Sequence, residues 1–192
     1  EINILKGKIE SKVSQSDLDK SIANIIIGGR NLVDYASSGG GNTKLDKEGN
    51  ITFLGEVKDT YFSLTLYEDL VEGETYTLSL NAENVPEDCN WIFGIQKQTN
   101  KYQIKINKNG RLSATFVAIK TDNMRRVLVD DISNAISGVK IKLSNFKIEK
   151  GNKATDYTVA PEKTYKLVAD NIKVVTDKIS TVESNLTQKT NS

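Results

Sequence analysis

Histidine is absent from these 192 residues, and cysteine occurs once, as Cys89. Without histidine, the chain lacks the side chain that most often serves as a general base and metal ligand near neutral pH. A single cysteine cannot form an internal disulfide or a thiolate metal cluster. Catalysis would have to rely on carboxylates or lysines, and we expect no cofactor and assign no metal.

A strong net charge and long hydrophobic runs are also missing. Lysine and arginine number 26 against 25 aspartate and glutamate, so the formal net charge is +1. A nearly neutral chain has no strong field to attract nucleic acid or an anionic membrane. Apolar runs such as residues 25–27 are far shorter than the ~20 residues of a membrane-spanning helix. We therefore predict neither a nucleic-acid partner nor a membrane partner.

Acidic residues are densest at Asp130 and Asp131, with Asp122 upstream. Adjacent side chains of a strand face opposite sides, so this pair cannot act together as acid and base unless it lies in a loop. We interpret the pair as a solvated turn, with calcium bound at a loop as the alternative. Nucleophile-elbow and zinc-protease motifs are missing too. We predict that the chain is not an enzyme, and we assign no catalytic residue.

Apolar and polar residues alternate with a period of two between residues 28 and 156, which indicates strands. The alternating segments are residues 51–53, 61–67, 76–80, 91–96, 102–106, 112–116, 127–129 and 139–143. Asp46-Lys-Glu-Gly-Asn50 and Asn107-Lys-Asn-Gly110 are typical turns, and Ser37-Ser-Gly-Gly-Gly41 is interpreted as a surface loop. Short strands at nearly regular spacing predict a mainly β fold, an antiparallel jelly-roll-like β-sandwich of eight or nine strands.

A heptad pattern runs through the C-terminal residues, at Val168, Ile172, Val175, Ile179, Val182 and Leu186. Pro161 suits the first turn of a helix, and Glu162 beside it interacts favourably with the helix dipole. Because β-branched residues occupy one core position throughout and most of the other, the pattern favours a homotrimer over a parallel dimer. The alternative is a single amphipathic helix that packs on its own domain.

A second helix is predicted near the N-terminus. Ser16 and Asp19 have the spacing of a capping box, and Leu18, Ile22 and Ile25 follow on one face, which indicates a short helix at residues 17–25. We therefore divide the chain into three parts. Residues 1–27 form a shaft or linker with the short helix, residues 28–160 form the sandwich, and residues 161–192 form a coiled-coil helix.

Two recognisable motifs frame the β-region. The N-terminal motif is Gly29-Arg30-Asn31-Leu32, and the C-terminal motif is Lys147-Ile-Glu-Lys-Gly-Asn-Lys-Ala-Thr-Asp-Tyr157 with Ala160-Pro161-Glu162. Both resemble the boundaries of carbohydrate-binding-like sandwich domains in tail proteins of phages that infect Gram-positive bacteria. Ser11-Lys-Val-Ser-Gln-Ser-Asp-Leu-Asp-Lys20 looks like a spacer of tail fibres and accessory baseplate proteins of such phages. Tyr157 and Val159 depart from the tryptophan and proline that this family commonly has.

The resemblance implies a virion protein of the phage tail or baseplate that binds a host cell-surface saccharide without catalysis. Its implied partners are host cell-wall polysaccharide and other tail or baseplate proteins. Two alternatives stay open, namely a structural spacer or decoration domain without a ligand, and a tail-associated glycan hydrolase. A module displayed on an elongated shaft has its two ends close together, so we expect the two motifs to meet.

The candidate saccharide contacts surround Trp91, the only tryptophan. Aromatic rings cover the apolar faces of sugars, while amide and guanidinium groups bond to the hydroxyls. Alternation places Trp91 on the face opposite Gln96, so Trp91 is either a core residue or a platform that a bulge at Gly94 re-aims. The predicted carbohydrate-binding residues are Trp91, Gln96, Gln98, Tyr102 and Arg125.

Overall fold

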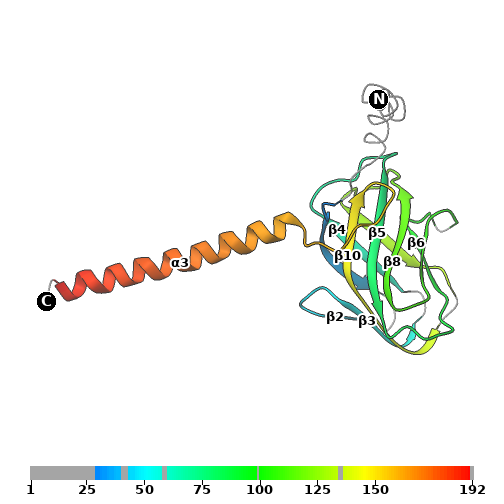
Figure 1. The fold of residues 1–192 in the computed structure, drawn as a ribbon, viewed down its shortest axis with the longest axis horizontal. Helices are drawn as coiled ribbons and strands as arrows, with labels where there is room; N and C mark the ends of the chain where they lie inside the picture. Colours follow the sequence, from blue (N-terminus) through cyan, green and yellow to red (C-terminus); the bar gives the residue numbers. More distant parts are fainter. Residues whose placement is uncertain (1–28, 40–42, 58–59, 99, 134–135, 191–192) are drawn as a thin grey trace, which may run out of the picture.

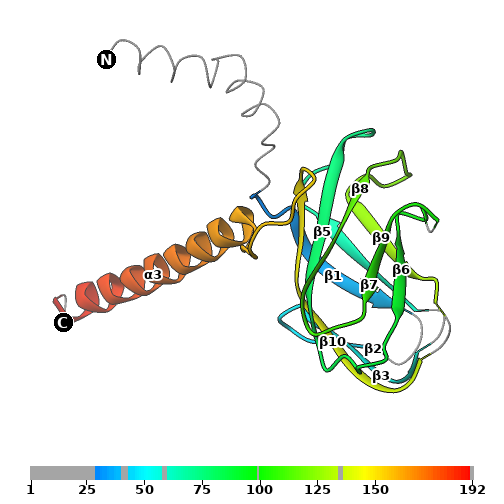
Figure 2. The same ribbon diagram turned by 45° about the vertical axis from the view of Figure 1, so that its right-hand side comes forward.

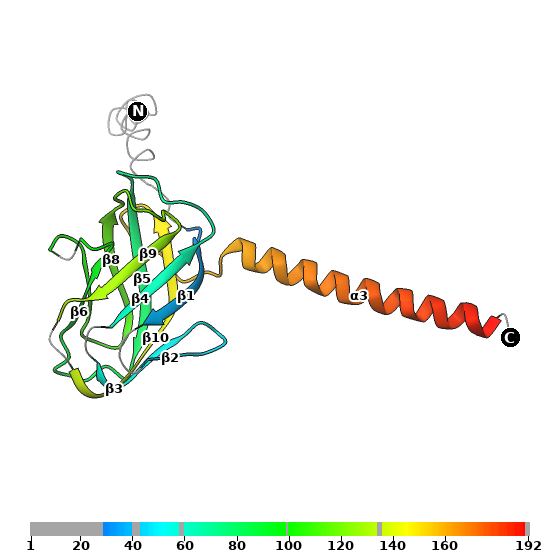
Figure 3. The same ribbon diagram turned by 180° about the vertical axis from the view of Figure 1, so that it is seen from behind.

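The computed structural model describes residues 29–39, 43–57, 60–98, 100–133 and 136–190. These residues form ten strands and one long helix (Figure 1). The strands make two antiparallel sheets of five strands each, whose inner faces pack against one another. Figure 1 shows one sheet in front, and Figure 3 shows the other from behind. The helix predicted at residues 17–25 lies outside the described residues.

The first sheet has the strand order β1-β4-β9-β6-β7. Its strands are β1 (Val33–Gly39), β4 (Tyr61–Leu66), β9 (Arg126–Asp131), β6 (Trp91–Ile95) and β7 (Gln103–Ile106). The interpretation of residues 37–41 as a loop needs correction at residues 37–39, which belong to β1, while residues 40 and 41 lie outside the described residues. Ser37 pairs there with Ser63 of β4. Their hydroxyls lie 2.8 Å apart. Gly39 ends the strand close to Tyr61, and a Cβ there would lie 2.3 Å from the end of the Tyr61 side chain, which would have to move.

The second sheet has the strand order β2-β3-β10-β5-β8. Its strands are β2 (Thr43–Leu45), β3 (Ile51–Val57), β10 (Ile136–Lys150), β5 (Thr75–Glu83) and β8 (Gly110–Val117). From β3 to β10 the chain crosses between the sheets at nearly every step, which is the strand order of a jelly roll. The prediction of an antiparallel β-sandwich is confirmed. The strand count exceeds the predicted eight or nine because β1 and β2 each extend the edge of a sheet.

The core lies between the two sheets and is built by the alternation of apolar residues along each strand. Its centre is an aromatic cluster in which the Trp91 ring lies edge-on to Phe53, with 4.6 Å between the ring centroids. Phe93 packs on Trp91 at 4.5 Å and on Phe62 at 5.3 Å. All four side chains are fully buried. They anchor β6, the strand that leads directly to the candidate site.

The two sequence motifs meet at one end of the sandwich, as expected. The Asn31 amide donates to the carbonyls of Phe146 at 3.1 Å and Thr158 at 2.9 Å, and its Oδ1 accepts from the backbone of Val33. Arg30 pairs with Glu162 at the start of the helix. Residues more than 110 positions apart in the chain are thereby held together.

Helix α3 (Pro161–Thr190) begins at the predicted proline and extends away from the sandwich as a single rod (Figure 2). Four heptad residues, Val168, Ile172, Val175 and Ile179, are 51–61% exposed. The alternative in which this helix packs on its own domain is therefore wrong for this part of the heptad seam. None of the described helical residues make a segment long and apolar enough to cross a membrane.

Candidate functional site

A groove of about 390 Å³ lies at one end of the first sheet, a size within the usual range for ligand pockets. The turn after β6, the loop between β8 and β9, and the first residues of β9 form its walls. Its lining residues are Gln96, Lys97, Ile119, Lys120, Thr121, Asp122, Asn123, Arg126 and Leu128. We call this site the Gln96 groove.

A tight turn of unusual geometry positions Gln96. The backbone of Gln98 donates to the carbonyl of Ile95 at 2.9 Å, and Gln96 and Lys97 between them have φ values of 52° and 60°. Two successive positive φ angles define a type I′ turn, which normally takes Asn or Gly and strains longer side chains. The backbone of Gln96 also donates to the carbonyl of Leu128 at 2.8 Å, which ties the turn to β9.

The side chain of Gln96 is 2% exposed and carries one unused hydrogen-bond donor. Its Oε1 accepts from the backbone N–H of Ile119 at 3.1 Å, whereas Nε2 has no partner among the described residues. Flipping the amide would set Nε2 against that N–H, so the orientation is determined. A buried donor without an acceptor costs about 1–3 kcal/mol.

Charged groups surround this amide. Lys97, Lys120 and Arg126 are exposed on the groove, together with the carboxylate of Asp122. Asp130 lies two residues beyond Leu128 on the same face of β9 and is half-buried. Burial raises the pKa of the Asp130 carboxyl, and the positive charges of Lys97 and Arg126 partly oppose that rise. The groove thus combines fixed donors and acceptors with two apolar side chains, Ile119 and Leu128.

The structure does not bring the five predicted contact residues together. Trp91 has no exposed surface, so it belongs to the core and cannot cover a sugar. Gln98 donates from Nε2 to the carbonyl of Val117 at 3.0 Å, and Tyr102 packs against the core. Arg125 is exposed and pairs with Asp69 at 3.0 Å, outside the groove.

Gln96 is the predicted residue that lines the groove, and Arg126 takes the place expected for Arg125. The sequence signal for Arg126 was its position in the alternation, because every second residue of a strand lies on the same face and Arg126 therefore shares a face with Leu128 and Asp130. Lys97 and residues 119–123 carried no such signal, since a turn and a loop bring them to the site. They are the residues that sequence reasoning missed.

Catalytic chemistry has little support in the described residues. Asp130 and Asp131 lie in β9 and not in the solvated turn that we expected, and they face opposite sides of the strand. Asp131 accepts from the backbone and hydroxyl of Ser133. Burial raises the pKa of the Cys89 thiol, which keeps the sulfur from being a ready nucleophile. No group of three or more potential metal-ligating acidic or thiol side chains occurs in the described part of the chain.

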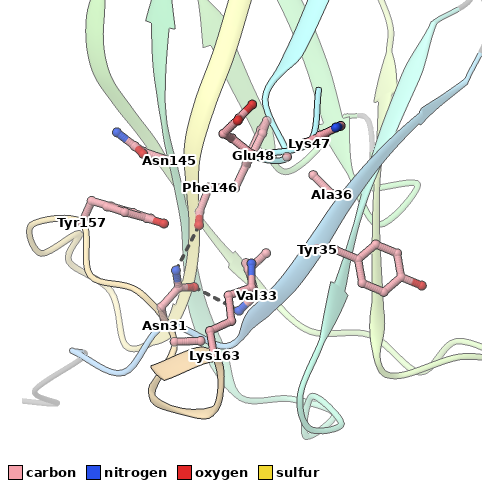
Figure 4. A pocket seen from close by; sticks show the side chains of 12 residues that line it. Asn31, Val33, Tyr35, Ala36, Lys47, Glu48, Asn145, Phe146, Tyr157 and Lys163 are labelled. Atoms are coloured by element: carbon pink, nitrogen blue, oxygen red, sulfur yellow. Dashed lines mark hydrogen bonds between the residues drawn. The ribbon is translucent and has the colours of Figure 1, made fainter. Parts of the chain in front are cut away.

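A second cavity lies where the two motifs meet, between β1, β10 and the start of α3 (Figure 4). Its volume is about 140 Å³, below the usual range for a ligand pocket. The Asn31 amide has partners inside the chain, and the Tyr35 ring points away from the cavity (Figure 4). This cavity is better explained as part of the contact between the motifs than as a binding site.

No protein-family profile matches the sequence, and no curated protein matches it. Similar solved structures include a carbohydrate-binding module described as CBM4, with 11% identity over 60% of this chain and 86% of that one, at a TM-score of 0.40. The N-terminal cellulose-binding domain of Cellulomonas fimi β-1,4-glucanase C has 13% sequence identity over 62% of this chain and 91% of that one, at a TM-score of 0.39. A tripod structure from the baseplate of bacteriophage Tuc2009 has 17% sequence identity over 60% of this chain and 51% of that one, at a TM-score of 0.37.

These neighbours are carbohydrate-binding modules and a phage baseplate structure, the two kinds of protein that the sequence motifs resemble. Both kinds of protein are what this chain is similar to, at the level of the fold only. The identities and TM-scores are low, so no conclusion about the ligand or the site rests on them.

Proposed function

We propose that this chain is a non-catalytic saccharide-binding module of a phage tail or baseplate, and that the Gln96 groove holds the saccharide. The buried, unused amide donor of Gln96 carries the proposal, because its orientation is determined and Gln96 lines a groove large enough for a sugar ring. The setting on the virion, at the host cell surface, rests on the motifs of the sequence.

The groove has the chemistry that sugar recognition needs. Hydroxyl groups both donate and accept, so they require a mixture of fixed donors and acceptors. Gln96 and Arg126 supply donors, while the carboxylate of Asp122 supplies acceptor oxygens. Ile119 and Leu128 are apolar and can cover the CH groups of a pyranose ring. None of the described lining residues is aromatic, so hydrogen bonds would carry more of the affinity than stacking.

A glycan array that includes cell-wall polysaccharide of the host is the direct test. The substitution Gln96→Glu keeps the oxygen that accepts from Ile119 and removes the free donor. We expect it to weaken binding about tenfold or more, since a lost hydrogen bond leaves the ligand oxygen unpaired. Titration calorimetry of the full chain measures the change.

Gln98→Glu is the matched control, because it removes the same kind of donor from the same turn outside the groove. It should leave the affinity within about twofold. Equal affinity in both variants, with unchanged melting temperatures, would place the site elsewhere on the sandwich. Absence of binding to every glycan on the array would favour the spacer or decoration alternative. Hydrolysis of a glycan would favour a hydrolase.

The proposal includes a homotrimer formed through α3. Its heptad seam leaves large apolar side chains in solvent. β-Branched residues fill one core position and most of the other, which favours a bundle of three helices. Three modules on one shaft would raise the effective concentration of weak sugar contacts, so that avidity exceeds a single affinity by roughly a hundredfold or more.

Sedimentation equilibrium should therefore show a trimer of the full chain. Ile172→Asp should dissociate it to monomers, because three carboxylates would be buried at one level of the seam. Val174→Asp should leave the trimer intact, since Val174 is equally exposed in the single chain but lies off the seam. A monomer at every concentration of the unsubstituted chain would show that the seam does not associate.

A further inference from the structure

The cations of the Gln96 groove form no ion pair with any residue that the structure describes. Arg30, Arg125, Lys147 and Lys150 each form an ion pair with a carboxylate of the same chain. Among the residues that the structure describes, no ion pair or side-chain hydrogen bond engages the positive groups of Lys97, Lys120 or Arg126. Three positive charges on one groove therefore have no contacting carboxylate among the described residues.

The neutral donor of Gln96 lies within the same wall. Its Nε2 is buried without a partner among the described residues while Oε1 is held by Ile119, and Gln96 lines the same groove as the three cations. An anionic oxygen accepts hydrogen bonds about twice as strongly as a neutral one. The combination of a fixed amide donor with free cations suits a ligand oxygen that bears negative charge.

Asp130 is the internal competitor for those cations. It is half-buried near Lys97 and Arg126, and its carboxyl makes no hydrogen bond to either of them. Burial opposes its negative charge, so the cations are only partly compensated by it. A ligand anion that reached both cations would be opposed by Asp130 at longer range.

We propose that the saccharide of the Gln96 groove is acidic and that Gln96, Lys97 and Arg126 together hold its carboxylate or phosphate group. The inference rests on the proposed function and names the ligand class of the same site. Asp130 then weakens binding by like-charge repulsion, and its removal should strengthen binding.

Calorimetry of the full chain with matched probes tests this inference. One arm compares an oligogalacturonate with its methyl ester, and the other compares a sugar phosphate oligomer with its dephosphorylated form. In at least one arm the acidic probe should bind about tenfold more tightly than its neutral partner, and the arms distinguish carboxylate from phosphate. The difference should shrink at high salt, because exposed charges are screened.

Three substitutions should move the affinity for the acidic probe in opposite directions. Arg126→Gln and Lys97→Asn should weaken it about fivefold to tenfold each, and asparagine tolerates the positive φ at residue 97. Asp130→Asn should strengthen it about threefold. Arg125→Gln is the control, because this neighbouring arginine pairs with Asp69 outside the groove and should change the affinity by less than twofold.

The possible failures are distinguishable. Equal binding of acidic and neutral probes, with no effect of Arg126→Gln, would overturn the acidic ligand and leave saccharide binding in place. Weaker binding by Asp130→Asn in a folded protein would also overturn it. Failure to bind any saccharide, on the array or in calorimetry, would overturn the acidic ligand together with the proposed function.

Discussion

Replacing Lys147 by methionine should lower the free energy of unfolding by about 3–5 kcal/mol, because it would leave the buried carboxylate of Glu149 without its cation. Both side chains are fully buried, with Lys147 Nζ lying 3.4 Å from Glu149 Oε2. Lys147 also donates to Thr155 Oγ1 at 2.6 Å and to the Asp156 carbonyl at 2.9 Å. Urea denaturation followed by circular dichroism measures the loss.

The cost comes from the complete hydrogen bonding of this cluster. Glu149 accepts from the backbone N–H of Thr155 at 2.8 Å and from its hydroxyl at 2.7 Å. Residues after β10 therefore fold back over the outer face of the second sheet and are held there by charge. Removing the lysine breaks its own bonds to Thr155 and Asp156 and leaves a buried anion without its cation, which is more damaging than the loss of one surface pair.

Lys150→Met is the matched control in the same strand. Lys150 pairs with Glu74 at 3.1 Å, but both side chains are about half exposed, so the loss should stay below about 1 kcal/mol. The double substitution Lys147→Met/Glu149→Leu should cost less than the two single changes added together, because neither charge is then left unpaired. Equal costs for Lys147→Met and Lys150→Met would refute the role of the buried pair.

Trp91→Ala should cost about 3–5 kcal/mol of stability, because it removes the largest ring at the centre of the aromatic cluster. The two packed neighbours, Phe53 and Phe93, cannot fill the space that the indole leaves. Thermal and urea unfolding measure the loss. Saccharide affinity of the fraction that remains folded should be unchanged, since the ring has no exposed surface.

Tyr35→Ala provides the comparison. This tyrosine is 55% exposed on the outer face of the first sheet, and its truncation should change stability by less than about 0.5 kcal/mol. A loss of affinity without a loss of stability in Trp91→Ala would show that the tryptophan is a binding platform after all, in conflict with its burial.

The candidate site was predictable in part. Alternation along β6 placed Gln96 on the face opposite Trp91 and Phe93, and the structure confirms that parity for the buried rings. It did not show that Gln96 ends the strand in a type I′ turn, because neither Gln nor Lys is typical of positive φ. Alternation also did not show whether Arg125 or Arg126 lines the groove, because that depends on the residue at which β9 begins.

The sequence by itself determined the β-sandwich and the start of α3. A period of two over short segments, turn residues between them and a proline before a heptad seam are local properties, and local geometry translates them directly into strands and a helix. Association of that helix stays a prediction, because it depends on other copies of the chain.

The tertiary structure decided which polar residues are buried and which are free. Lys147 and Glu149 alternate with apolar neighbours and look like solvent-facing charges, yet residues 151–160 cover them. Gln96 looks like an exposed amide, yet the loop at Ile119 closes over it and leaves one donor unused. Both outcomes depend on segments distant in sequence or outside regular strands, and the alternation of a single strand contains no information about what covers its outer face.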